Sequence, residues 1–287
     1  MSEFLKRIAI VGSDHVESIL SMGEMCSQRQ DVAFVLYGDS HRTQDILDTH
    51  DIDAAYWTIV HTNDDICSCD LASTDASNGY IDVLMKGSVR TSDFIKAILD
   101  KKKELIPAGA LLSHVAKIEL PWYHKPLYLT DAAISIKPDL DKKVSILENA
   151  LNLARSSGIP IPKVALICPV EMVNPGIVST TDAAQIVFLH NSTGRLGKAI
   201  VEGPFALDVA LSKKAALVKH IQGDVPGDAD ILLLPDLDSA NATLKAFILT
   251  PGVHYGGVVV GSKVPAVLTS RSDSADNRLR SMMLALS

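Results

Sequence analysis

Short apolar runs of β-strand character alternate with segments of helical periodicity along most of this chain, and this alternation constrains the fold more than any other feature. One such unit is the run Ile81–Met85, followed by a polar turn over Lys86–Ser92 and a helical segment. Repeated strand, short turn and helix are typical of α/β proteins with largely parallel sheets. The predicted strands are Arg7–Gly12, Val32–Tyr37, Ile81–Met85, Leu127–Leu129, Val164–Cys168, Ile231–Leu234, Gly257–Gly261 and Val264–Leu268.

Four segments place apolar residues at helical spacing, and each predicts a helix with one buried face. The third of them begins near Asp139 and ends near Gly158. The predicted inward residues are Val16, Ile19 and Leu20 in the first segment, Phe94, Ile95, Ile98 and Leu99 in the second, Val144, Leu147, Leu151 and Ala154 in the third, and Leu279, Met282, Met283 and Leu286 in the last.

The chain has 287 residues, which exceeds the usual size of a single domain, so we expect two lobes. Pro107–Gly109 and the stretch near Gly261 are the best places for the chain to cross between lobes. The predicted division is residues 1–106 with 260–287 as the first α/β lobe and residues 107–259 as the second.

The formal net charge of −7, without a basic block, argues against nucleic acid as a partner, because nucleic-acid affinity comes mainly from neutralising phosphates. An anionic substrate would have to be held by a few local cations and backbone donors. The four cysteines are expected to be reduced thiols. The N-terminus lacks the long apolar region of a signal peptide, and no apolar run approaches membrane-spanning length, so we expect a cytoplasmic protein without a membrane partner.

The segment Ser270-Arg271-Ser272-Asp273-Ser274 lies between an apolar strand and the last predicted helix. Free backbone N–H groups and the helix dipole make a helix N-terminus suited to phosphate or an oxyanion, and Arg271 would add a bidentate cation. The alternative is plain helix capping, because Ser270 and Asp273 have capping-box spacing. Spacing alone favours capping.

A second candidate anion site follows the strand that ends near Lys86. Thr91 and Ser92 open the next helix, and ligands gather at the carboxyl ends of strands in open α/β sheets. Lys86, Arg90 and Lys96 could therefore meet an anion there, although solvated surface charge explains Arg90 and Lys96 when each is taken singly.

Other motifs are absent or point to structural roles. Gly12 stands alone, so there is no dinucleotide-binding fingerprint, and neither a P-loop nor a metal-binding histidine spacing is present. We expect His114 to be a hydrogen-bonded core residue, and Asp228 and Asp230 to have structural roles at a turn.

Several segments, in their order along the chain, resemble the phosphate acetyltransferase and butyryltransferase family, and look closer to its butyryl or branched-acyl branch. The resemblance covers about Asp82 to the C-terminus. The matching segments are Asp82–Gly87, Leu112–Ala116, Leu129–Ala133, Asn174–Asp182, Glu202–Asp208, Gly227–Leu232, Gly261–Pro265 and Thr269–Ser274.

The resemblance implies two α/β lobes like those of isocitrate and isopropylmalate dehydrogenases, with the active site in the interlobe cleft, and usually a homodimer. It implies the reaction acyl-CoA + phosphate ⇌ acyl phosphate + CoA by direct transfer in a ternary complex, with no metal or other cofactor and coenzyme A as a substrate. Ser270 would hydrogen-bond the thiol or carbonyl region, and Arg271 would stabilise negative charge. Ser272 and Ser274 would help to bind phosphate or CoA.

Two positions depart from the acetyl-type pattern. Lys96 stands where an arginine binds phosphate in those members, so the charge is kept and the bidentate fork is lost. Asn277 stands where an aspartate is the proposed base for the CoA thiol. Asp276 and Asp273 are the nearest substitutes.

Two other function classes stay open at this point. One is a metal- and nicotinamide-dependent oxidative decarboxylase on the same fold, and the other is a non-catalytic acyl-CoA or acyl-phosphate sensor. The sequence does not reveal the acyl-chain preference or the physiological direction.

Overall fold

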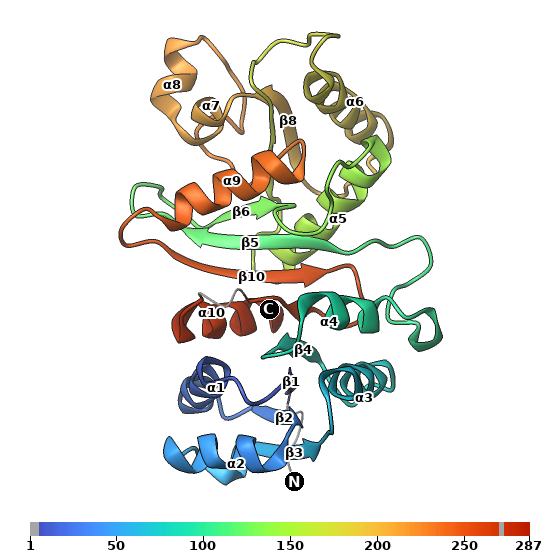
Figure 1. Cartoon of the computed structure of the whole chain (residues 1–287). Coiled ribbons are helices and arrows are strands. Elements are labelled where there is room, and N and C mark those ends of the chain that lie inside the picture. The colour runs from blue at the N-terminus through green and yellow to red at the C-terminus, as the bar shows by residue number, and fades with distance from the viewer. Residues whose placement is uncertain (1–5, 270–272) are drawn as a thin grey trace. The chain divides into compact units, whose positions relative to one another are not determined.

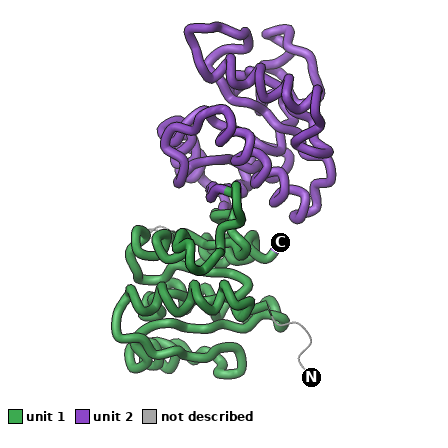
Figure 2. Tube along the Cα trace, turned by 90° about the vertical axis from the view of Figure 1, so that its right-hand side faces the viewer, with its two compact units in different colours: residues 1–110, 256–286 green, residues 111–255, 287 purple. Residues whose placement is uncertain are grey.

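The computed structural model describes residues 6–269 and 273–287, which form an α/β protein with mostly parallel strands (Figure 1). The chain divides into two compact units, one formed by residues 1–110 and 256–286 and the other by residues 111–255 and 287 (Figure 2). None of the described helices combines the length and apolar character needed to cross a bilayer.

The first unit contains a sheet with the strand order β3-β2-β1-β4-β11-β10. Its pairs are parallel except for β10 with β11. Helices α1 and α10 pack together on one face, and α3 and α4 pack together on the other (Figure 1). The elements are β1 (Lys6–Val11), α1 (Val16–Gln28), β2 (Val32–Gly38), α2 (Ser40–Thr49), η1 (Ala54–Tyr56), β3 (Trp57–His61), α3 (Asp65–Ser77), β4 (Val83–Lys86), α4 (Thr91–Ile98), η2 (Lys101–Lys103), β10 (His254–Val260), β11 (Ala266–Val267) and α10 (Ala275–Ala285).

The second unit has the strand order β5-β6-β9-β7-β8, in which only β5 and β6 are antiparallel among the described pairs. Its elements are β5 (Ser113–Glu119), β6 (Leu127–Thr130), α5 (Leu140–Ser156), β7 (Lys163–Ile167), α6 (Val178–Thr193), β8 (Ile200–Phe205), α7 (Leu207–Leu211), α8 (Lys213–Val218), β9 (Ile231–Leu233) and α9 (Leu237–Ile248).

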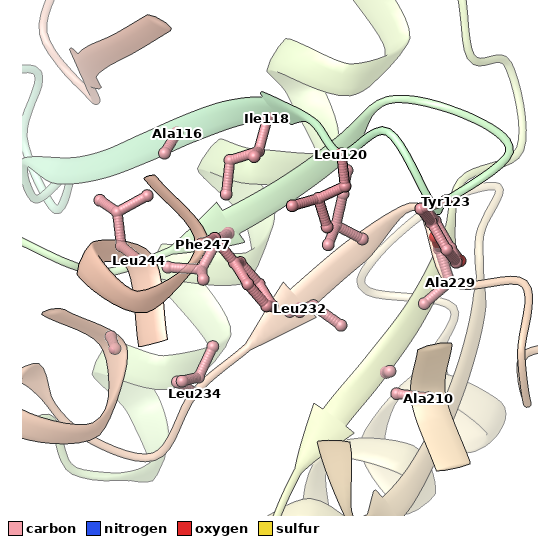
Figure 3. Packing of buried hydrophobic residues seen from close by; sticks show 14 of the residues in the cluster. Ala116, Ile118, Leu120, Tyr123, Ala210, Ala229, Leu232, Leu234, Leu244 and Phe247 are labelled. Carbon is pink, nitrogen blue, oxygen red and sulfur yellow. The ribbon is translucent and has the colours of Figure 1, made fainter. Parts of the chain in front are cut away.

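The core of the second unit lies between this sheet and the helices that follow its strands. Ile118 of β5, Leu232 of β9 and Phe247 of α9 belong to one buried apolar cluster (Figure 3). The predicted face of α5 is confirmed, because Val144, Leu147, Leu151 and Ala154 are all fully buried. Asp139 caps this helix by accepting from the Lys142 N–H at 3.0 Å.

Three other predicted helix faces are partly wrong. Val16 is 41% exposed at the start of α1, and Leu99 is 51% exposed beyond the end of α4. In α10, Met283 and Leu286 are only partly buried, and the buried positions one turn earlier are taken by Arg278 and Ser281. Whether these residues are buried depends on how close they lie to the helix end and on which helix packs against them. Apolar spacing alone does not predict it.

Candidate active site

Strands β1, β4 and β11 end at the same edge of the first unit's sheet. Val11 is paired with Lys86, and Val267 is paired with Met85, in parallel registers. Loops that follow parallel strands meet at their carboxyl edge, where open α/β sheets bind ligands. The predicted site residues 86–96 begin at the end of β4, and residues 273–276 follow β11, so the topology brings these described residues to one edge.

The loops after β1 and β4 pack backbone against backbone. Gly87 N donates to the Val11 carbonyl at 2.8 Å, and Ser88 N donates to the Gly12 carbonyl at 2.9 Å. Gly12 has a φ of +78°, and a Cβ placed on Gly87 would lie 2.0 Å from the Gly12 carbonyl oxygen. Glycine is therefore required at both positions.

Lys86 is buried, and its amine holds the loop that follows it. Its Nζ donates to the carbonyl oxygens of Gly87 at 3.0 Å and Val89 at 3.1 Å. These bonds place a positive charge inside the carboxyl edge. Its role in binding phosphate or CoA stays a prediction.

Helix α4 begins with exposed residues and without a side-chain cap. Arg90 is the N-cap residue and makes no side-chain capping bond, and Thr91 and Ser92 are exposed. The Arg90 guanidinium instead donates to Asp93 at 2.7 Å in an exposed ion pair. The side chain of Arg90 therefore does not cap the first N–H groups of α4. An anion site at this helix start would need those N–H groups to be left uncapped by Arg90.

A cavity of about 810 Å³ lies beside α3, α4 and η2 in the first unit. Ser92 and Lys96, both predicted as binding residues, line it together. Ile66 and Leu99 supply exposed apolar surface in its wall. Lys96 has no hydrogen-bond or ion-pair partner among the described residues. Its charge is therefore available to a ligand.

The segment after β11 leads into α10. Ser270, Arg271 and Ser272 lie outside the described residues. The capping alternative does not describe the start of α10, because this helix begins at Ala275 and its cap is Ser274, which accepts from the Asn277 N–H at 3.2 Å.

The two candidate bases lie on either side of this cap. Asp273 is partly buried, just before Ser274. Asp276 lies in the first turn of α10, exposed, where it accepts from the Arg280 guanidinium at 2.9 Å.

Sequence reasoning missed two cationic or ionisable residues at this edge. Arg278 of α10 is 1% exposed, and its guanidinium donates to the hydroxyl of buried Thr269. His15 is the N-cap residue of α1. Burial, together with the charges of Arg278 and Lys86, lowers the pKa of His15 below its ordinary value. Residues before Asp82 thus contribute to the edge, although the sequence there carried no motif.

In the second unit, the carboxylate of Asp131 joins two of the segments that carry the family resemblance. Asp131 accepts backbone N–H bonds from His114 at 3.1 Å, from Ala133 and Ile134 at 3.0 Å, and from Ser135 at 3.0 Å. His114 is buried, as predicted. These contacts fix the turn after β6 against the start of β5.

Asp228 and Asp230 form a charged cluster in the second unit, in keeping with their predicted structural role. Asp228 contacts Lys163 at 2.6 Å, His124 at 2.7 Å and Lys125 at 3.0 Å, and Asp230 contacts Lys125 at 2.8 Å. Burial alone would raise the pKa of Asp228, but the hydrogen bonds from Lys163, His124 and Lys125 together hold it well below its usual range.

All four cysteines are free thiols, as predicted. Within residues 6–269 and 273–287, no three His, Cys, Asp or Glu side chains are grouped so that they could hold a metal ion.

Comparison with known proteins assigns the chain to a family. The family model described as Phosphate acetyl/butaryl transferase matches residues 58–286. A phosphate butyryltransferase of Clostridium beijerinckii is 35% identical over 280 residues, covering 98% of this chain and 92% of the relative. A probable phosphate butyryltransferase of Bacillus subtilis is 37% identical over 281 residues, with the same coverage of 98% and 92%.

A solved structure leads to the same assignment. The crystal structure of a branched-chain phosphotransacylase from Enterococcus faecalis V583 matches with a TM-score of 0.87 and 32% identity, covering 98% of each chain. The resemblance inferred from the ordered motifs is therefore confirmed. The chain belongs to the phosphate acetyl/butyryl transferase family.

Proposed function

We propose that this protein is a phosphate acyltransferase, which transfers a short acyl group between coenzyme A and inorganic phosphate. The observation that carries the proposal is identity of 35% with a phosphate butyryltransferase across 98% of the chain. The carboxyl edge of the first unit supports it, because that edge gathers Lys86, the start of α4, and the described residues Asp273 and Ser274 before α10. The proposed acyl groups are butyryl, branched-chain or acetyl.

The proposed chemistry is direct attack of phosphate on the thioester carbonyl while both substrates are bound. Arg271 would stabilise the charge on the tetrahedral intermediate, and Ser270 would hydrogen-bond the thiol or carbonyl region. When the intermediate collapses, the C–S bond breaks and CoA leaves as a thiolate, which takes up a proton. In the reverse direction Asp276 or Asp273 would remove that proton from the thiol. Coenzyme A is a substrate here, and we propose no resident cofactor or metal.

Binding of the anionic substrates is proposed to involve α4 and the cavity beside it. The helix start at Thr91 and Ser92 offers backbone donors to a phosphate, and Lys96 offers an unpaired charge. The wall of the cavity is partly apolar, which suits an organic anion better than phosphate alone. The isocitrate dehydrogenase-like comparison and the placement of the site in an interlobe cleft stay predictions.

We also propose a cytoplasmic homodimer. An exposed apolar surface on α6 and the loop before it supports the oligomeric part of the proposal. Val178 and Phe188 of α6 are 66% and 72% exposed, and Met172 and Val173 in the preceding loop are 79% and 53% exposed. Contiguous apolar surface on a protein commonly marks an interface.

One assay tests the activity. The purified protein is mixed with acetyl-, butyryl- or isobutyryl-CoA, with and without millimolar phosphate, and thiol release is measured. We expect phosphate-dependent release that a chelator does not change and that Arg271→Ala abolishes. The proposal fails if no short acyl-CoA gives thiol release, or if the protein binds CoA without turning it over.

A further inference from the structure

The cavity of about 810 Å³ in the first unit extends along helix α4, on the face of the sheet that α3 and α4 cover (Figure 1). We call it the α4 groove, and its lining includes Ile66, Cys69, Ser92, Lys96, Lys101 and Lys102. Ser92 lies in the first turn of α4, whereas Lys101 and Lys102 belong to η2, beyond its last turn. Because α4 has 8 residues, the two ends of the groove lie on the order of 12 Å apart. The groove is therefore longer than inorganic phosphate requires, and its volume suits an organic ligand.

Apolar side chains form much of the wall of the α4 groove. Cys69 of α3 is the buried residue of the lining, at 3% exposure. Burial raises the pKa of its thiol to about 12, so the thiol is neutral at physiological pH. Ile66 and Leu99 line the groove while 65% and 51% exposed. A ligand that covers these two side chains gains free energy from the apolar surface removed from water.

The carboxylates in the lining already have donors within the protein. Asp70 contacts Lys103 at 2.6 Å, and Asp93 accepts from the Arg90 guanidinium at 2.7 Å. Asp100 caps η2 through its backbone N–H groups. These carboxylates are therefore bound to neighbouring groups rather than to the other lysines of the groove.

The ammonium groups of Lys101 and Lys102 remain available at the η2 end. Both residues are exposed, and neither side chain has a hydrogen-bond or ion-pair partner in the part of the chain that the structure describes. A second cavity of about 390 Å³ shares Leu99 and Lys101 with the α4 groove, and Lys263 also lines it. Two adjoining cavities with several cations around them suit a ligand that carries more than one phosphate group.

We propose that the α4 groove binds coenzyme A, with Lys101 and Lys102 holding the phosphates of its nucleotide end. The pantetheine arm then lies along the apolar wall at Ile66 and Leu99, and it extends towards the carboxyl edge at Ser92. The inference rests on the proposed function, which supplies coenzyme A as a substrate. Coenzyme A combines a long uncharged arm with a nucleotide that carries a diphosphate and a 3′-phosphate, so its length and charge match an apolar groove with lysines at one end.

The first experiment compares two acyl donors on the purified full chain and on the double variant Lys101→Ala/Lys102→Ala. With butyryl-CoA we expect the KM to rise by roughly 3- to 20-fold, as for the loss of two exposed ion pairs, with little change in kcat. Butyryl-pantetheine lacks the nucleotide, so its KM should not change. The KM for inorganic phosphate should not change either.

The wall of the groove has a separate test in Leu99→Asp. A carboxylate on the wall should raise the KM of butyryl-CoA and of butyryl-pantetheine alike, because both donors carry the arm. The exposed lysine pair of α8 gives the matched control Lys213→Ala/Lys214→Ala. Leu217 of α8, 74% exposed, gives the control Leu217→Asp. Both controls should keep the wild-type KM for each donor.

The second experiment measures binding without turnover, by calorimetric titration with adenosine 3′,5′-bisphosphate. This probe carries phosphates of the nucleotide end and has no thiol. We expect Lys101→Ala/Lys102→Ala to weaken its binding by the same factor that raises the KM of butyryl-CoA. Added salt should weaken binding to the wild type more than to the variant, because the two lysine charges are exposed to screening.

The inference is overturned if Lys101→Ala/Lys102→Ala keeps the wild-type KM for butyryl-CoA, or if it raises the KM of butyryl-pantetheine equally. A rise in the phosphate KM instead would show that these lysines serve inorganic phosphate and not the nucleotide. An active wild type with an unchanged KM for butyryl-CoA removes only this inference. An inactive wild type removes the acyltransferase proposal, and the titration then still decides whether the two lysines bind a nucleotide.

Discussion

The hydroxyl of Ser88 donates a hydrogen bond to the carboxylate of Asp14, and so joins the loop after β4 to the loop after β1. The backbone hydrogen bond from Ser88 N to the Gly12 carbonyl reinforces this link. The carboxyl edge of the first unit is therefore one connected structure, in which a change in either loop reaches the other.

Gly12 and Gly79 provide a matched pair that tests this connection. Both have a φ of +78°, but a Cβ on Gly12 would lie 2.5 Å from Ser88 Oγ, whereas a Cβ on Gly79 would meet nothing within 4 Å. We expect both alanine variants to lose about 1–2 kcal/mol of unfolding free energy from the left-handed backbone, and Gly12→Ala to lose more, because its Cβ would also lie 2.8 Å from the Val89 N. Only Gly12→Ala should also lose activity, by about tenfold in kcat/KM, since the two loops must separate. Urea unfolding and thiol-release assays measure both effects, and equal losses of activity would contradict the argument.

Lys96 is expected to bind phosphate through its charge. Because it has no protein partner in the described structure, Lys96→Ala should raise the KM for phosphate by about tenfold with little change in kcat. Lys96→Arg should keep a low KM, since arginine restores the charge and adds a bidentate fork. The exposed Lys198 of the second unit serves as the control, in the variant Lys198→Ala. An unchanged phosphate KM in Lys96→Ala would remove the residue from the site.

Asp276 is the candidate base that we predict to act on the CoA thiol, and the Arg280 guanidinium contacts its carboxylate at 2.9 Å. Asp276→Asn should lower kcat in the CoA-consuming direction by about 100-fold, the order expected when a general base is removed. Asp273→Asn should cost less. Steady-state rates of acyl-CoA formation from acyl phosphate and CoA measure the two effects. A larger loss in Asp273→Asn would transfer the role to that residue.

Asp228 should make stability depend on pH in the acidic range. The pKa of Asp228 is lower in the folded protein than in the unfolded chain, so its contribution is complete above the unfolded value of about 3.9 and is lost as the pH falls towards the folded value. Asp228→Asn should therefore cost about 1–3 kcal/mol near neutral pH, and the difference from wild type should shrink on acidification below about pH 4. Thermal unfolding across pH measures this, and a difference that grows in acid would show the sign to be wrong.

Phe188 tests the proposed dimer. Placing a charge on the outer face of α6 should disfavour association, because the carboxylate would lose water in an apolar interface. Phe188→Glu should therefore elute as a monomer in size-exclusion chromatography with light scattering, at a concentration where the wild type is a dimer. Leu249, 82% exposed after α9, gives the control Leu249→Glu, which should remain dimeric. A dimeric Phe188→Glu would place the interface elsewhere.

The fold could be predicted where one segment of the sequence contains both the capping residue and the apolar spacing of its helix. Helix α5 is 17 residues long, and its aspartate cap and apolar stripe all agree, so Asp139 and the face of Val144 and Leu147 were predicted correctly. Helix α10 carries a conflicting signal. Its partner α1 comes from the other end of the chain, and that packing cannot be read from the local spacing of Met283 and Leu286.

Some residues of the candidate site could likewise be predicted from the sequence, and others could not. Topology and helix starts were enough to predict that Lys86 ends a strand and that Ser92 and Lys96 lie on the helix after it, whereas their binding roles stay predictions. Arg278 could not be found from the sequence, because arginine is rarely fully buried and its partner, Thr269, lies outside the helix, two residues after β11. A charged residue at a position where helical spacing requires an apolar one is the signal that could have indicated it.

The division of the first unit between residues 1–110 and 256–286 has a consequence for biosynthesis. On the ribosome β1 to β4 emerge first, but β11, which pairs with β4, is translated only after residues 111–255 of the second unit. The second unit is almost continuous and can fold as soon as residue 255 has emerged. The nascent chain therefore holds an incomplete carboxyl edge in the first unit until β11 has emerged and paired with β4.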